Sequence, residues 1–237
     1  MSIRSTRTLL WLGAAGPVVF IATYLVNGAA QPGYDSSHDT ISALSLAPHG
    51  WIQNANFLVY GVLTLCFAEA LRRCAALRST GYVSLIVAGT GLILLGFFPT
   101  DPVLGFPEGA PTTITAIGTV HSMVALVVFV AFPVAAFAAA RRRNPGWTAF
   151  SIVIGVLSLA AVGAFFAAVE GTEAGAQSSA GLYERLPTLF IGLWQIAFAL
   201  RVSIRTPPRT AETWPSPADA RPRATGASAG RSTAPTR

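Results

Sequence analysis

Charge is scarce in this sequence. Only 11% of the 237 residues are charged, whereas 52% are hydrophobic, and soluble domains carry about 25% charged residues. So few charges cannot cover the surface of a soluble protein of this length. The apolar residues also gather in long blocks separated by short polar breaks, which is typical of a chain that crosses a membrane several times.

Residue types and motifs that would point to other classes are absent or rare. The two cysteines, Cys66 and Cys74, match neither a metal site nor a disulfide framework, so we expect free thiols. Lysine is absent, so the basic residues are all arginine and the net charge is +6. They stand beside apolar blocks without interleaved aromatics, so no nucleic-acid partner is predicted. No HExxH, P-loop, dinucleotide-binding or Ser-His-Asp pattern occurs, and no cofactor is predicted.

Six apolar blocks are each long enough to span a bilayer as an α-helix. Inside a bilayer the backbone must satisfy its own hydrogen bonds, and none of the blocks alternates as a barrel strand would. We therefore predict an all-α, polytopic membrane protein, a bundle of six transmembrane helices within residues 1–205. The predicted helices are Leu9–Asn27, Trp51–Leu71, Gly81–Phe98, Ile114–Ala140, Trp147–Val169 and Leu186–Ile204.

The first block has some features of a cleaved signal peptide. Arg4 and Arg7 precede it, and small residues at 28–30 follow it. Its apolar stretch is longer than the usual 7–15 residues and contains Pro17, so we expect it to be retained as a helix.

The arginines alternate between the two sides of the predicted bundle. One side holds almost all arginines that flank the helices, and the other holds only Arg185. Because cytoplasmic loops retain positive charge, we predict a cell-membrane protein with both termini in the cytoplasm. The arginines of the cytoplasmic side are Arg4, Arg7, Arg72, Arg73, Arg78, Arg141, Arg142, Arg143, Arg201, Arg205 and Arg209.

The end of the chain changes in composition. Residues 206–237 are rich in Pro, Ala, Thr, Ser and Arg and contain few large apolar side chains. Such a segment buries too little surface to offset its ordering entropy, so we predict a disordered cytoplasmic tail. Apart from the bilayer itself, anionic lipids of the inner leaflet are predicted partners of Arg141, Arg142 and Arg143.

The first predicted outer connection carries a concentration of polar residues. Asp39 stands before a short apolar run, which predicts a helix N-cap and an interfacial helix from about Thr40 to Leu46. The functional alternative makes His38, Asp39 and Ser42 part of a site at the outer mouth of the bundle. Acidic residues gather on the same predicted side: Asp35, Asp39, Asp101, Glu108, Glu170, Glu173 and Glu184.

A second candidate feature joins the third and fourth helices. Asp101 follows the third helix, and His121 lies on the order of 10 Å inside the fourth, at 1.5 Å per residue. An ionisable residue within a bilayer is costly and points to function. Asp101 beside His121 would suit a proton relay, a general base or half of a metal site. The alternative is a neutral histidine hydrogen-bonded within the bundle, and the spacing of the histidines predicts no metal site.

Three segments resemble the bacterial and archaeal domain-of-unknown-function family 998. They are Pro-Gly-Tyr-Asp-Ser-Ser-His-Asp-Thr-Ile-Ser-Ala-Leu at 32–44, Gly-Phe-Phe-Pro-Thr-Asp at 96–101, and the histidine that opens the fourth helix. The resemblance covers about residues 8–205 and implies a compact six-helix membrane protein. It carries over Tyr34, Asp39, Ser42, Asp101 and His121. One departure is Ala43, where an acidic residue often follows Ile-Ser. The family supplies no settled activity.

These features leave three functional hypotheses. The favoured one is a non-catalytic partner or scaffold protein with an acidic outer face. The alternative is a membrane enzyme that acts on lipid or an outer-leaflet substrate, with Asp39, Asp101 and His121 as catalytic candidates and Tyr34, His38 and Ser42 as ligand-binding candidates. A small transporter is disfavoured, because the predicted midplane is almost entirely apolar and shows no inverted repeat.

Overall fold

The described residues form six long helices and one short helix, in a computed structural model that describes residues 3–111, 113–140, 144–172 and 176–205. All six long helices have the length and apolar composition to cross a membrane. The prediction of an all-α, multi-pass membrane protein is therefore confirmed. The elements are α1 (Ile3–Ala30), the 3-10 helix η1 (Ser42–Leu46), α2 (Trp51–Arg73), α3 (Ser79–Phe97), α4 (Ala116–Ala138), α5 (Pro145–Glu170) and α6 (Ala180–Arg205).

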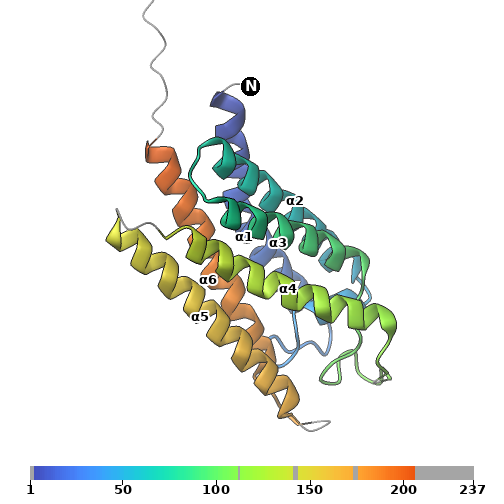
Figure 1. Cartoon of the computed structure of the whole chain (residues 1–237). Helices are drawn as coiled ribbons and strands as arrows, with labels where there is room; N and C mark the ends of the chain where they lie inside the picture. The colour runs from blue at the N-terminus through green and yellow to red at the C-terminus, as the bar shows by residue number, and fades with distance from the viewer. Residues whose placement is uncertain (1–2, 112, 141–143, 173–175, 206–237) are drawn as a thin grey trace, which may run out of the picture. The chain divides into compact units, whose positions relative to one another are not determined.

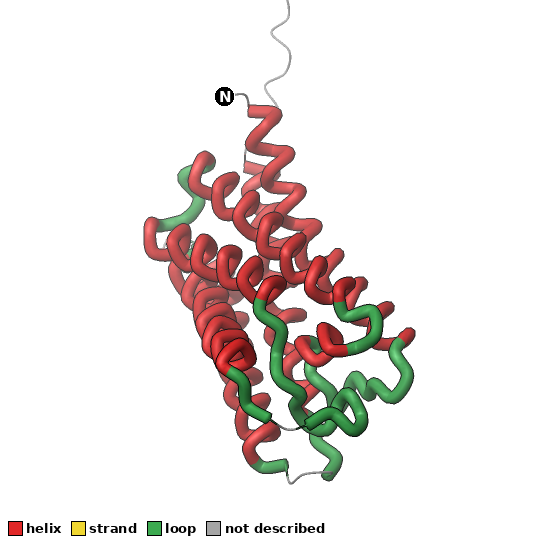
Figure 2. Tube along the Cα trace, turned by 90° about the vertical axis from the view of Figure 1, so that its right-hand side faces the viewer, coloured by secondary structure: helices red, strands yellow, loops and turns green. Residues whose placement is uncertain are grey.

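The helices pack in chain order and close into a ring. Each packs against its neighbours in the sequence, and α6 packs against α1, while α4 and α6 have little direct contact. Three connections gather at one end of the bundle, as Figure 2 shows; their described residues are 31–50, 98–111 with 113–115, and 171–172 with 176–179. We call this the loop end. The first residue of α1 and the last of α6 lie at the opposite end (Figure 1).

Small residues allow the close packing of α2 and α3. A Cβ added at Gly61 would lie 2.6 Å from the carbonyl oxygen of Gly89, so the two backbones touch there. Aromatic side chains fill the middle of the ring, where Phe20 stacks on Tyr60 with ring centroids 4.9 Å apart. Large apolar side chains also face outward, as at Val26 and Met123, and these contact the lipid bilayer.

Five of the six helix starts differ from the predictions, those of α1 and α6 by six residues and those of α3, α4 and α5 by two. The structure begins α6 at Ala180, six residues before the predicted Leu186. The apolar pattern stops at Glu184 and Arg185, but both side chains are buried by partners from another connection, so the helix continues through them. The fourth helix begins at Ala116 and not at Ile114, because the Thr115 hydroxyl accepts the Gly118 N–H and fixes the first turn there.

Candidate functional site

The connection between α1 and α2 folds differently from the prediction at Asp39. The expected cap of the short helix is wrong, because the cap position is Ile41 and no side chain on it caps the helix. The Asp39 side chain points toward residues that precede it in the chain, and its Oδ2 accepts the backbone N–H of Asp35 at 2.8 Å. The capping oxygen comes from α6, since Glu184 Oε2 accepts the Ile41 N–H at 2.5 Å. The predicted short helix exists, but it starts at Ser42.

Bonds also run in the opposite direction, from α6 to the first connection. The first turn of a helix has backbone N–H groups without partners inside the helix. In α6 the Gly181 N–H donates to the His38 carbonyl at 3.1 Å, and the Leu182 N–H donates to the Ser37 carbonyl at 3.0 Å. A Cβ at Gly181 would overlap the Asp39 carbonyl oxygen, so glycine permits this approach.

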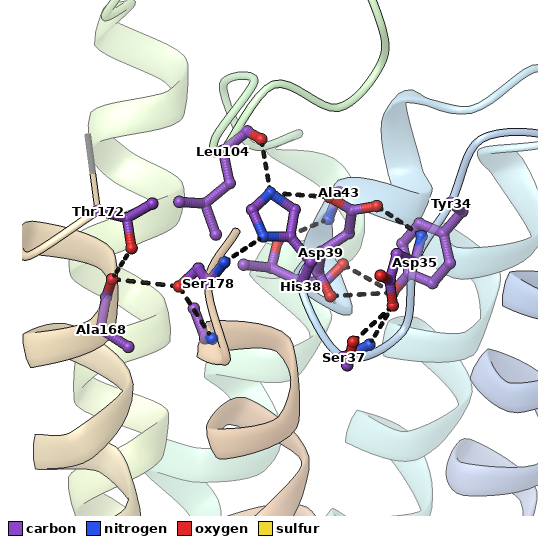
Figure 3. A network of polar contacts seen from close by, with 12 residues as sticks. Tyr34, Asp35, Ser37, His38, Asp39, Ala43, Leu104, Ala168, Thr172 and Ser178 are labelled. Carbon is purple, nitrogen blue, oxygen red and sulfur yellow. Dashed lines mark hydrogen bonds and ion pairs between the residues drawn. The ribbon is translucent and has the colours of Figure 1, made fainter. Parts of the chain in front are cut away.

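The imidazole of His38 links all three connections of the loop end (Figure 3). Its Nδ1 accepts the Ser178 N–H at 2.8 Å, so that nitrogen carries no proton. Its Nε2 lies 2.9 Å from the Leu104 carbonyl oxygen and therefore donates to it. The same Nε2 is 4.0 Å from Asp39 Oδ1. Both ring nitrogens are thus engaged with backbone atoms of other connections.

Burial and hydrogen bonding move the pKa values of neighbouring groups in opposite directions. Burial raises the pKa of Asp39, and the Asp35 N–H bond and His38 only partly oppose that shift. The pKa of the exposed Asp35 carboxyl is lowered, because it accepts bonds from the hydroxyl and the N–H of Ser37. Burial also raises the pKa of Tyr34.

Arg185 lies buried behind this connection and is only 7% exposed. It donates to the Asp39 carbonyl at 3.1 Å, the Gly181 carbonyl at 2.7 Å and the Tyr34 hydroxyl at 2.6 Å. Its guanidinium also stands 5.5 Å from the ring centre of Tyr24. Within the described part of the chain, it forms no ion pair with a carboxylate.

Glu184 reaches the interior of the bundle rather than its surface. It is 5% exposed and lines a cavity of about 60 Å³ whose walls come from α1, η1, α2, α3, α4 and α6. The other polar groups of the wall are Ser42, Thr188 and Tyr60, and the remaining wall is apolar. The Ser42 hydroxyl donates to Glu184 Oε1 at 3.4 Å, and Tyr60 donates to Gln195 at 2.6 Å.

Asp101 and His121 occupy the start of α4. Asp101 accepts the Thr115 N–H at 2.8 Å and the Thr115 hydroxyl at 2.7 Å, so it anchors the first turn. His121 Nδ1 lies 2.6 Å from the Phe98 carbonyl oxygen and donates to it. Its Nε2 is buried and has no hydrogen-bond partner among the residues that the structure describes. A Cβ at Gly118 would overlap the Asp101 carboxylate.

The candidates from the sequence therefore separate into two groups. Tyr34, His38, Asp39 and Ser42 gather around the start of α6, whereas Asp101 lies in the α3–α4 connection and His121 in the first turns of α4. In the described ranges, no hydrogen bond or ion pair joins Asp39 to the second group. The same ranges hold no cluster of three metal-ligating side chains.

Two further residues that contact the first group were not predicted as site residues from the sequence. Glu184 and Arg185 were predicted to lie on the outer side, just before the sixth helix, but they lie within α6 and are buried and hydrogen-bonded. The signal that could have found them is an adjacent acid and base within an apolar stretch, because such charges need partners.

Comparison with curated proteins and with solved structures finds no match. A family profile does match, over residues 14–201. The match includes both groups of residues described above and all but the ends of α1 and α6. This chain belongs to the family described as "Protein of unknown function (DUF998)".

Proposed function

We propose that the protein is a non-catalytic membrane protein, a partner or scaffold for other components that uses the loop end as its contact surface. One observation carries the proposal: His38, Asp39 and Asp101 all use their side chains to hold backbone groups of the connections. A general acid or base needs to lie within hydrogen-bond reach of a substrate, whereas these three side chains are directed at groups of the protein itself. Groups that hold N–H and C=O atoms instead fix the shape of the loop end.

Exposed charge on the same surface supports a contact role. The acidic side chains of Asp35, Glu108 and Glu170 are exposed there and come from different segments, whereas Asp39 and Glu184 are buried. Ile114 lies on the same side and is 89% exposed. A fixed, negatively charged surface with an apolar side chain suits a partner with a basic contact surface.

The second candidate is a membrane enzyme that acts on lipid or an outer-leaflet substrate through Asp39, Asp101 and His121. The observation in its favour is the buried Nε2 of His121, which keeps an unused lone pair. A transporter has less support, because Tyr60 and Gln195 in the middle of the bundle hydrogen-bond to each other and leave only Nε2 of this pair without a partner in the described ranges.

The arginine pattern supports a cell-membrane protein with cytoplasmic termini. The loop end would then face outward. Arg141, Arg142 and Arg143 would lie near anionic inner-leaflet lipids; they are outside the described residues, as is the tail at 206–237. Reporters fused after residue 143 or at the C-terminus should be cytoplasmic, and an external reporter at either position would overturn this orientation.

Two measurements test the functional proposal. Lipid mass spectrometry should find the same lipid composition in membranes that contain the wild-type protein and in membranes that contain a D101N/H121Q variant at equal level. A lipid that is consumed or formed only by the wild-type protein would favour the enzyme instead.

After mild detergent extraction, the wild-type protein should migrate as a complex larger than one chain, and a D35R/E108R variant should migrate as a single chain. A wild-type protein that migrates as a single chain would contradict the proposed partner role.

A further inference from the structure

The cavity inside the bundle has one polar end and a long apolar wall. Ser42, Glu184 and Thr188 come from η1 and the first turns of α6, so they form the end nearest the connections. The aromatic rings of Phe20, Phe57, Phe129 and Phe132 form much of the remaining wall. A cavity with this distribution fits an amphipathic molecule, because the head and the body of such a molecule need different surroundings.

Glu184 has hydrogen-bonding capacity that the protein does not use. A carboxylate offers about four lone-pair directions. Oε2 accepts the Ile41 N–H at 2.5 Å, the Ser42 hydroxyl lies 3.4 Å from Oε1, and the Ser42 N–H is a third donor to the carboxyl, so about one lone-pair direction is left. Among the residues with described placement, no arginine or histidine forms an ion pair with it. A carboxyl group this deeply buried gains from any additional donor.

Part of the cavity wall faces outward on α4 and α6. Ala125 of α4 and Thr188 of α6 line the cavity, and both are partly exposed. These two helices have little direct contact with each other. Because both helices have the length and composition of membrane spans, we place the mouth of the cavity between them, toward the bilayer.

The volume limits what enters. About 60 Å³ corresponds to about four to six water molecules, or to the head and first carbon atoms of a chain. The rest of a longer molecule would lie in the opening between α4 and α6, where the surrounding side chains are apolar.

We infer that this cavity is a binding site for a membrane-borne amphipathic molecule whose head donates hydrogen bonds, an alcohol or an amine, with Glu184 as the acceptor and the apolar chain between α4 and α6. We expect an acidic head of the same size not to bind, because it would place a second carboxyl group beside the buried Glu184. The site stands independently of the partner role of the loop end.

The test uses the full chain in lipid nanodiscs and three photoreactive probes with the same twelve-carbon chain: a primary amine, an alcohol and a carboxylic acid. The amine, the alcohol or both should label α4 and α6 saturably, with mass-spectrometric sites around Ala125 and Thr188. The acid should show no saturable labelling. Equal saturable labelling by the acid would overturn the assignment of the head, and labelling that never saturates would overturn the site.

Variants separate the site from general lipid contact. A125F places a large side chain in the cavity, leaves Glu184 itself unchanged, and should reduce saturable labelling at least tenfold. L126F is the matched control, because Leu126 is 45% exposed on the lipid-facing side of the same helix, and its labelling should equal that of the wild type. E184Q should weaken labelling by the amine more than labelling by the alcohol. Unchanged labelling of a folded A125F protein contradicts the proposal, whatever E184Q does to folding.

Discussion

Glu184 and Ile41 are hydrogen-bonded at 2.5 Å across 143 positions of the sequence. Beside them a bond runs the other way, from the Gly181 N–H to the His38 carbonyl. The first connection and the start of α6 therefore satisfy each other's free backbone groups. If either of these two segments were buried without the other, its N–H groups would lack partners, and a buried N–H group without a partner is costly.

Replacement of Glu184 by alanine should destabilise the protein. The Ile41 N–H would remain buried without an acceptor, at a cost of about 1–3 kcal/mol in the free energy of unfolding. E184Q keeps an acceptor oxygen and should lose less. Thermal unfolding in detergent measures both, with E170A as the control at an exposed glutamate. Equal melting temperatures for E184A and E170A would show that the bond to Ile41 adds nothing.

The variant H38A should loosen all three connections together. It removes the acceptor of the Ser178 N–H and the donor to the Leu104 carbonyl, so amide hydrogen exchange at Ser178 and Phe106 should rise by an order of magnitude or more. A factor of ten corresponds to about 1.4 kcal/mol of local stability. The exposed His49 provides the control variant H49A. Faster exchange confined to residues 31–40 would contradict the linking role of His38.

Asp39 should make stability fall as the pH rises. Its pKa is raised in the folded protein, so the folded state binds more protons than the unfolded state between the ordinary aspartate value of about 3.9 and the raised value. Stability from this group is then complete below the unfolded pKa and is lost as the pH passes the folded pKa. D39N lacks this titration and should match the wild type at low pH and gain relative to it at neutral pH. A stability difference between the two proteins that does not change with pH would exclude this linkage.

Gly118 and Gly146 form a matched pair near the starts of two helices. A side chain at Gly118 would displace the Asp101 carboxylate from Thr115, whereas Gly146 has open space around it. G118A should lower the free energy of unfolding by about 1–3 kcal/mol, and G146A should leave it unchanged or raise it by up to about 1 kcal/mol. Comparable melting temperatures for the two variants would argue against the role of Asp101 as an anchor.

The helices were predictable because their signal is local. The apolar residues of a block indicate by themselves that it is buried in a bilayer, and each of the six predicted blocks overlaps one long helix of the structure. The start of α6 was predicted too late for the same reason. Glu184 and Arg185 break the apolar pattern, and only their partners around Ile41 and Tyr34, far away in the sequence, make their burial acceptable.

For the candidate site, the sequence predicted several of the residues but not the contacts that they make. The sequence indicated His38, Asp39, Asp101 and His121 as unusual, but not what each one contacts. Leu104 and Ser178, the partners of His38, are backbone contacts from two other connections, and a backbone N–H or C=O leaves no trace in residue type. The sequence pattern assigned the cap of the short helix to Asp39, the carboxylate nearest to it along the chain. In the structure the carboxylate beside the start of this helix is that of Glu184, which is distant in sequence.

The closed ring of helices has a consequence for synthesis. The chain emerges from its first residue onward, so the segment between α1 and α2 leaves the ribosome long before Gly181, Glu184 and Arg185 exist. Its contacts with those residues can form only when the sixth helix arrives and docks against the first. The helix that is synthesised last therefore completes the contacts of the first connection. A nascent chain that ends before α6 lacks the hydrogen bonds that hold this connection in place.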